Sequence, residues 1–196
     1  MERAGARMGN AVLSADLDGD GRKEEIRLLL ERRTGRGGVA VYSDGDEQSR
    51  FLRKDYFPFS AVVGDIDNDG DAEVLIGLYD RSKDRSGRFA MKLHVFDYEA
   101  GRLKPRWFTD REFEWFGVVR QGDRNLLAVT ERSGDRWSLR TWKWQDFGFW
   151  LEEPIFVSEE PFSCDTIENG LVATSTGGRR IEVIASGDGW QTRRLR

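Results

Sequence analysis

Apolar and polar residues alternate along much of this chain with a period of two. Trp142 and Trp144 alternate with Lys143, and the β-branched residues Val39 and Val41 alternate with Ala40. A period of two places successive side chains on opposite faces of a strand, whereas a helix would repeat every 3.6 residues. The pattern predicts an all-β protein and indicates no convincing helix.

Two segments of the chain resemble each other closely. Residues 12–30 read VLSADLDGDGRKEEIRLLL, residues 62–80 read VVGDIDNDGDAEVLIGLYD, and Asp16 and Asp65 are 49 positions apart. Each segment is an acidic loop that leads into an apolar run. Alternating runs follow, joined by turn sequences such as SDGDE and DYEAGR, which are typical of β-hairpins.

The strand pattern continues to the end of the chain, where the short turns RQGDRN and ENG stand in place of the acidic loops. Repeats of four strands with this period are typical of the blades of a β-propeller. We therefore predict a single β-propeller domain, 1–196, of about four four-stranded antiparallel blades. The predicted repeat units span about 10–52, 57–109, 113–156 and 162–196. An open stack and a half-ring completed by dimerisation are the alternatives.

The acidic loops carry oxygen ligands at alternate positions. Positions 1, 3, 5, 7 and 9 are Asp16, Asp18, Asp20, Arg22 and Glu24 in the first loop, and Asp65, Asp67, Asp69, Asp71 and Glu73 in the second. Glycine at position 6 permits a sharp turn, and the main-chain carbonyl of position 7 can supply an oxygen. An anionic, all-oxygen cage favours Ca²⁺ over Mg²⁺, because Mg²⁺ demands a more rigid octahedron.

An EF-hand loop begins in the same way but differs at its end. It needs a bidentate glutamate at position 12 and flanking helices. Position 12 is Arg27 in the first loop and Ile76 in the second, and both belong to β-rich runs. The EF-hand interpretation is therefore rejected.

The motifs DLDGDGRKEEI and DIDNDGDAEVLIG, with their 49-residue spacing, resemble the FG-GAP or VCBS repeat family. Members of that family form the Ca²⁺-loop blades of integrin α-subunit propellers and of many bacterial surface proteins. The resemblance implies two Ca²⁺ ions, held by the ten residues named above, with Arg22 and Asp71 acting through their carbonyls. Glu25 departs from the family, which usually has an apolar residue there, so the second loop fits better.

Charge and hydropathy limit the range of partners. The net charge is −4, and the two loops with Glu25 contain ten acidic residues, so the rest of the chain is net positive. Its arginines are scattered and form no basic stripe, which argues against nucleic-acid binding. No apolar window is long enough to span a membrane, so membrane insertion is not expected.

Location is predicted from two signals that disagree. The resemblance favours an extracellular or cell-envelope protein. The opening residues MERAGARMGN lack the apolar segment of a secretory signal, and this makes a cytoplasmic protein the alternative.

Residues suited to catalysis are few. His94 is the only histidine and lies in an alternating strand pattern, and Cys164 is the only cysteine. No nucleophile or phosphate-binding motif is present, so we expect no enzyme and no catalytic residue. Five of the seven tryptophans lie in the third unit, where Phe149 and Trp150 are the candidates for an exposed ligand-binding surface.

These observations favour a non-enzymatic calcium-binding propeller that acts as a protein- or glycan-binding scaffold, with Ca²⁺ in a structural role. The binding role follows from the family resemblance, since a fold alone does not fix a function. The alternatives are a polysaccharide-acting enzyme domain and half of a larger propeller formed by dimerisation.

Overall fold

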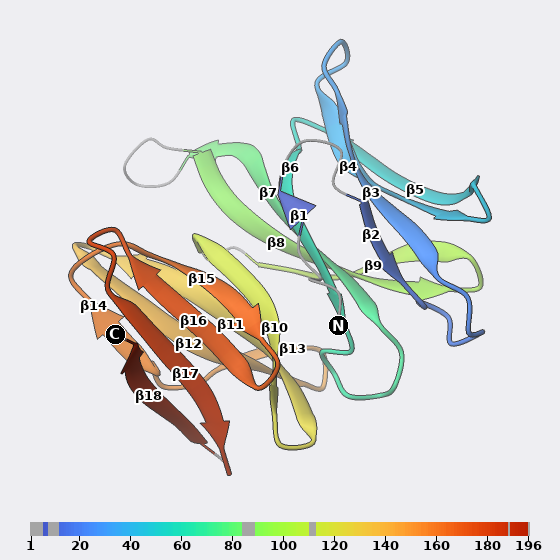
Figure 1. Cartoon of the computed structure of the whole chain (residues 1–196). Coiled ribbons are helices and arrows are strands. Elements are labelled where there is room, and N and C mark those ends of the chain that lie inside the picture. The colour runs from blue at the N-terminus through green and yellow to red at the C-terminus, as the bar shows by residue number, and fades with distance from the viewer. Residues whose placement is uncertain (1–5, 8–11, 84–88, 110–112, 188, 196) are drawn as a thin grey trace. The chain divides into compact units, whose positions relative to one another are not determined.

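A computed structural model describes residues 6–7, 12–83, 89–109, 113–187 and 189–195. Within these residues the chain forms strands and no helix, and the strands make four antiparallel sheets (Figure 1). The prediction of an all-β chain built from four four-stranded antiparallel units is confirmed at this level. The described part also contains no helix long and apolar enough to cross a membrane.

The chain divides into two compact units, of which the first comprises residues 1–65 and 69–112 and the second residues 66–68 and 113–196. The prediction of a single propeller domain stays a prediction.

The first unit contains two sheets whose strands pair in chain order. One sheet consists of β2 (Val12–Ala15), β3 (Glu24–Glu31), β4 (Arg36–Ser43) and β5 (Asp46–Lys54). The other consists of β6 (Phe57–Gly64), β7 (Glu73–Lys83), β8 (Phe89–Glu99) and β9 (Arg102–Phe108), with the short strand β1 (Ala6–Arg7) added beside β6.

One apolar core joins the two sheets of the first unit. The first sheet contributes residues such as Ile26 and Val41, and the second contributes residues such as Ile76 and Phe96. All four are at most 1% exposed. Alternate residues of a strand face this core, such as Val39 and Val41 of β4, as the period-two pattern predicts.

The second unit also contains two sheets. The first consists of β10 (Trp115–Gln121), β11 (Arg124–Ser133), β12 (Arg136–Gln145) and β13 (Gly148–Leu151), with β14 (Phe156–Ser158) pairing further along β12. The second consists of β15 (Phe162–Ile167), β16 (Gly170–Ser175), β17 (Arg180–Ser186) and β18 (Gly189–Leu195).

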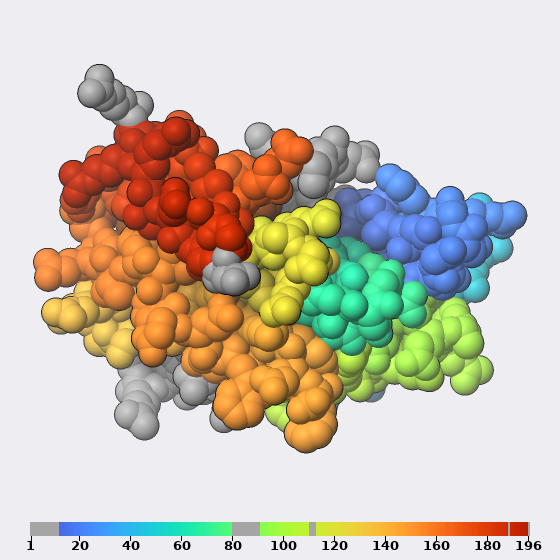
Figure 2. All heavy atoms as spheres, turned by 90° about the horizontal axis from the view of Figure 1, so that it is seen from below, coloured from blue at the N-terminus to red at the C-terminus, as the bar shows by residue number. Residues whose placement is uncertain are grey.

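The core of the second unit lies between its two sheets. Leu126 and Leu139 come from one sheet, and Leu171 and Val183 come from the other. The atoms of β10–β18, coloured from yellow to red, form one continuous packed body (Figure 2).

Two β-bulges occur at matching places in the sheets of the first unit. In the first sheet, Val41 pairs with Ser49 and Tyr42 with Glu47, so Gln48 is the extra residue. In the second sheet, the pairing jumps from Val95–Trp107 to Phe96–Pro105, which makes Arg106 the extra residue. A bulge changes the direction of the side chain of its extra residue. At the second bulge that residue is Arg106, which lies beside Glu73 of the second acidic loop.

Candidate metal centre

Each acidic loop bridges two neighbouring antiparallel strands. The first connects β2 to β3 and the second connects β6 to β7. The strand ladder ends at the loop, because Ala15 pairs with Glu24 and Gly64 pairs with Glu73. Both glutamates are only 2% exposed, so each loop closes over a buried carboxylate.

The first loop is curled by hydrogen bonds from its own main chain. Oδ2 of Asp16 accepts the N–H of Gly21 at 3.0 Å, and Oδ1 of Asp20 accepts the N–H of Arg22 at 2.7 Å. Gly21 has a φ of +86°, a conformation that glycine adopts without strain.

The second loop repeats these two hydrogen bonds. Oδ2 of Asp65 accepts the N–H of Gly70 at 3.2 Å, and Oδ1 of Asp69 accepts the N–H of Asp71 at 3.0 Å. Gly70 has a φ of +104°. The matching bonds explain the loop fold in both repeats: position 1 anchors the turn and position 5 caps its exit.

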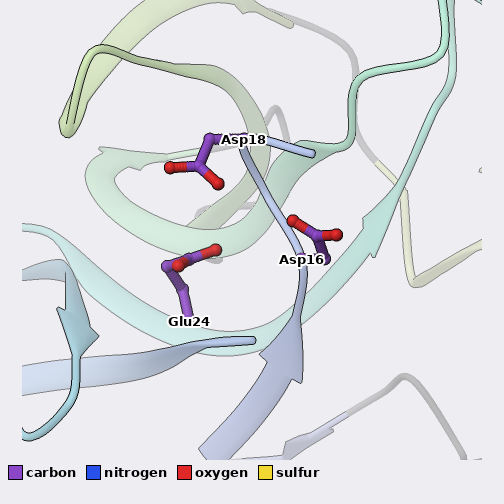
Figure 3. Close-up of side chains that lie close together, drawn as sticks. All are labelled: Asp16, Asp18 and Glu24. Atoms are coloured by element: carbon purple, nitrogen blue, oxygen red, sulfur yellow. The ribbon is translucent and has the colours of Figure 1, made fainter. Parts of the chain in front are cut away.

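Three carboxylates converge in each loop. Asp16, Asp18 and Glu24 each offer an oxygen within 4.8 Å of the others, and they surround a common space (Figure 3). Asp65, Asp67 and Glu73 form the same group in the second loop. Six of the ten predicted ligands are therefore brought together by the structure.

The other four predicted ligands lie outside these groups. The carboxylates of Asp20 and Asp69 cap main-chain N–H groups. The side chain of Arg22 lies 3.6 Å from Asp44, and Asp71 is exposed. Metal binding by Asp20 and Asp69, and by the carbonyls of Arg22 and Asp71, stays a prediction.

The first group has the properties of a cation site. Oδ1 of Asp16 is buried and has no hydrogen-bond partner among the described residues, although buried polar atoms are nearly always paired. Oε2 of Glu24 accepts the N–H of Leu17 at 2.9 Å, which orients its carboxylate toward the aspartates. The donors are all carboxylate oxygens, which suit a hard divalent cation.

Two neighbours distinguish the environment of the first group. Glu25 pairs with Arg27, and this hydrogen bond lowers the pKa of Glu25. Adjacent residues of a strand point to opposite faces, so Glu25 is directed away from buried Glu24. Burial raises the pKa of Tyr98, and the negative charges of Glu24 and Asp18 raise it further.

The second group has a different neighbour. Nη1 of Arg106 lies 3.5 Å from Oε1 of Glu73 and 3.0 Å from Oδ1 of Asp97. Neither Arg106 nor Asp97 is predicted from the sequence as a neighbour of the loop. They lie on β9 and β8, far along the chain from the loop, and only the strand pairing with its bulge brings them to Glu73.

The remaining candidate residues lie in different surroundings. His94 is 8% exposed and packs edge-on against Tyr56, with ring centroids 5.2 Å apart. Cys164 is 1% exposed, and burial raises the pKa of its thiol, which disfavours the reactive thiolate.

The two aromatic candidates differ from each other. Phe149 is partly buried and packs edge-on against Trp144 at 5.0 Å. Trp150 is 65% exposed, and Phe147, which the sequence analysis did not single out, is 89% exposed. The exposed aromatic pair of this hairpin is therefore Phe147 and Trp150.

No protein-family model matches the chain, and no curated protein matches it. Among solved structures, the rhamnogalacturonan lyase YesW matches with 15% identity and a TM-score of 0.48 over 98% of this chain. The chain spans about half of that lyase, 52% of its length. A Xanthomonas type IV secretion system related protein matches with 14% identity and a TM-score of 0.36, over the full length of both chains. These values are too low to bear on family or function.

Proposed function

We propose that this chain is a calcium-binding β-propeller of the FG-GAP or VCBS type that serves as a non-enzymatic binding scaffold. One Ca²⁺ ion is held in each acidic loop and stabilises the blade. The observation that carries the proposal is the convergence of Asp16, Asp18 and Glu24, together with the buried Oδ1 of Asp16 that lacks a hydrogen-bond partner among the described residues.

A bound cation would compensate the negative charge of the carboxylates that converge in each loop. Three carboxylates within 4.8 Å of one another repel each other when all are ionised, and burial of Glu24 strengthens the repulsion. A bound divalent ion neutralises this charge and ties the end of β2 to the start of β3. Ca²⁺ is favoured because it accepts irregular cages of carboxylate and carbonyl oxygens.

The scaffold role is supported by the surroundings of the potentially reactive residues. His94 is packed among aromatic rings, and Cys164 is buried. The exposed rings of Phe147 and Trp150 on the β12–β13 hairpin are suited to a protein or glycan partner, because aromatic faces bind both sugars and apolar side chains.

Calcium dependence is tested by thermal unfolding in metal-free buffer with EGTA and with excess Ca²⁺. At a hundredfold excess over Kd, one site contributes about 2.7 kcal/mol. For a chain of this size that corresponds to a rise in Tm of roughly 5–10 °C. Mg²⁺ at the same concentration is the control and is expected to restore much less. Equal melting in EGTA and in Ca²⁺ would refute the proposal of structural calcium.

The scaffold role is tested by a glycan array and a pull-down, each with and without Ca²⁺. Trp150→Ala is expected to lower the affinity for the captured ligand by about tenfold, which is within the range measured for aromatic residues at interfaces. Val157→Ala is the control, because Val157 is also exposed, at 53%, but lies away from the hairpin on β14. Cleavage of an array polysaccharide by the protein would contradict the non-enzymatic role.

A further inference from the structure

The second acidic loop has a cationic side chain beside its buried glutamate. We propose that Arg106 acts as an internal competitor of the metal at Glu73, so that the first loop binds Ca²⁺ more tightly than the second. The inference rests on the calcium binding proposed above and assigns an order to the two sites.

The geometry places the guanidinium on a predicted metal ligand. Nη1 of Arg106 is 3.5 Å from Oε1 of Glu73, while Oδ1 of Asp97 holds the same nitrogen at 3.0 Å. The side chain of Glu73 is 3% exposed and that of Arg106 is 24% exposed. Solvent therefore screens this contact only in part.

The corresponding place in the first loop is neutral. Val74 follows Glu73 and pairs with Phe96, just as Glu25 follows Glu24 and pairs with Tyr42. The register of the two bulges then makes Gln48 the counterpart of Arg106 and Ser43 the counterpart of Asp97.

The side chain of Gln48 is engaged elsewhere. Its Nε2 donates to the carbonyl oxygen of Asp46 at 3.3 Å. Within the described residues, no lysine or arginine forms an ion pair with Asp16, Asp18 or Glu24. The bulge of the first sheet thus carries a neutral side chain at the position where the bulge of the second sheet carries a guanidinium.

Two consequences follow from this difference. In the absence of metal, Arg106 offsets part of the repulsion among the carboxylates of the second loop. When Ca²⁺ enters, Arg106 competes for Oε1 of Glu73 and repels the incoming dication. Both effects lower the net gain from binding at the second loop, and neither operates at the first.

The test isolates the second loop by removing the first with Asp18→Ala. Calcium binding is measured by isothermal titration calorimetry in metal-free buffer for D18A and for D18A/R106Q. Arg106→Gln introduces the glutamine that the first repeat has at the matching position, Gln48. We expect this change to lower the Kd of the second loop for Ca²⁺ about tenfold. D18A/R102Q is the matched control, because Arg102 is an exposed arginine of the same strand, and its Kd is expected to stay within twofold.

An unchanged or higher Kd in D18A/R106Q would overturn the role of Arg106, as would an equal decrease in D18A/R102Q. If circular dichroism shows that D18A is unfolded, R106Q is compared with the unmodified chain. There, only the weaker of two Kd values is expected to fall. Absence of calcium binding in the unmodified chain would instead refute the proposed function itself, so the two failures are distinguishable.

Discussion

The two acidic loops share one sequence pattern but have different neighbours. Judged by sequence, the second loop is the better one, because Glu25 follows the first with a charge where an apolar residue is usual. The structure directs Glu25 away from the carboxylates, onto Arg27, and places a cation, Arg106, beside the second loop. A residue adjacent in sequence can therefore be directed away from a loop, while a residue of a distant strand lies against it.

The largest difference between the two loops is expected when each is removed in turn. Asp18→Ala is expected to abolish more than half of the effect of EGTA on Tm, and Asp67→Ala less than half, because the tighter site contributes more stability by mass action. The measurement is the difference in Tm between Ca²⁺ and EGTA for each variant. Asp135→Ala, at an exposed turn residue, is the control and should leave that difference unchanged. A larger loss in Asp67→Ala than in Asp18→Ala would reverse the proposed order of the sites.

A smaller effect is expected when the arginine of the second bulge is introduced at the first bulge. Gln48→Arg, in an Asp67→Ala background that leaves only the first loop, introduces at the first bulge the cation of the second. The Kd of the first loop for Ca²⁺ is expected to rise about threefold, or about 0.7 kcal/mol. The rise is smaller than the tenfold effect at the second loop because Ser43 does not anchor the new guanidinium as Asp97 anchors Arg106. Titration calorimetry measures the change, and a Kd that falls would count against the competition.

The smallest effect on calcium affinity is expected at Glu25, the residue by which the first loop departs from the family pattern. Glu25→Gln removes a carboxylate next to Glu24, but the side chain of Glu25 is directed to the other face of β3 and pairs with Arg27. The Kd of the first loop for Ca²⁺ should therefore change by less than twofold. A larger change in the titration would show that Glu25 takes part in the site.

The periodicity of the sequence was sufficient to predict the four-stranded units, but not the additional strands β1 and β14. Alternating apolar residues and the turn sequences predicted four antiparallel four-stranded units, because a strand buries every second side chain whatever its partner. The carboxylates at positions 1, 3 and 9 could also be predicted, since the loop is short and its curl is set by the glycine at position 6 and by bonds between near neighbours.

Other features of the site depend on exact side-chain geometry or on strand pairing, and they could not be predicted from the sequence. Asp20 and Asp69 accept main-chain N–H groups two residues further on and lie outside the converging groups. Asp16 and Asp65 also accept main-chain N–H groups, yet they belong to those groups, so which carboxylates converge depends on exact side-chain geometry. The position of Arg106 depends on the pairing of β8 with β9 and on a bulge that shifts the register. A one-residue shift would direct its side chain to the opposite face of the sheet.

Calcium titration of the unmodified chain in metal-free buffer tests whether the two acidic loops bind Ca²⁺ and whether they bind it unequally. Two sites per chain with unequal Kd values are expected, of which Asp67→Ala retains the tighter and Asp18→Ala retains the weaker. No binding, or binding that survives the removal of both aspartates, would contradict the assignment of Ca²⁺ to these loops.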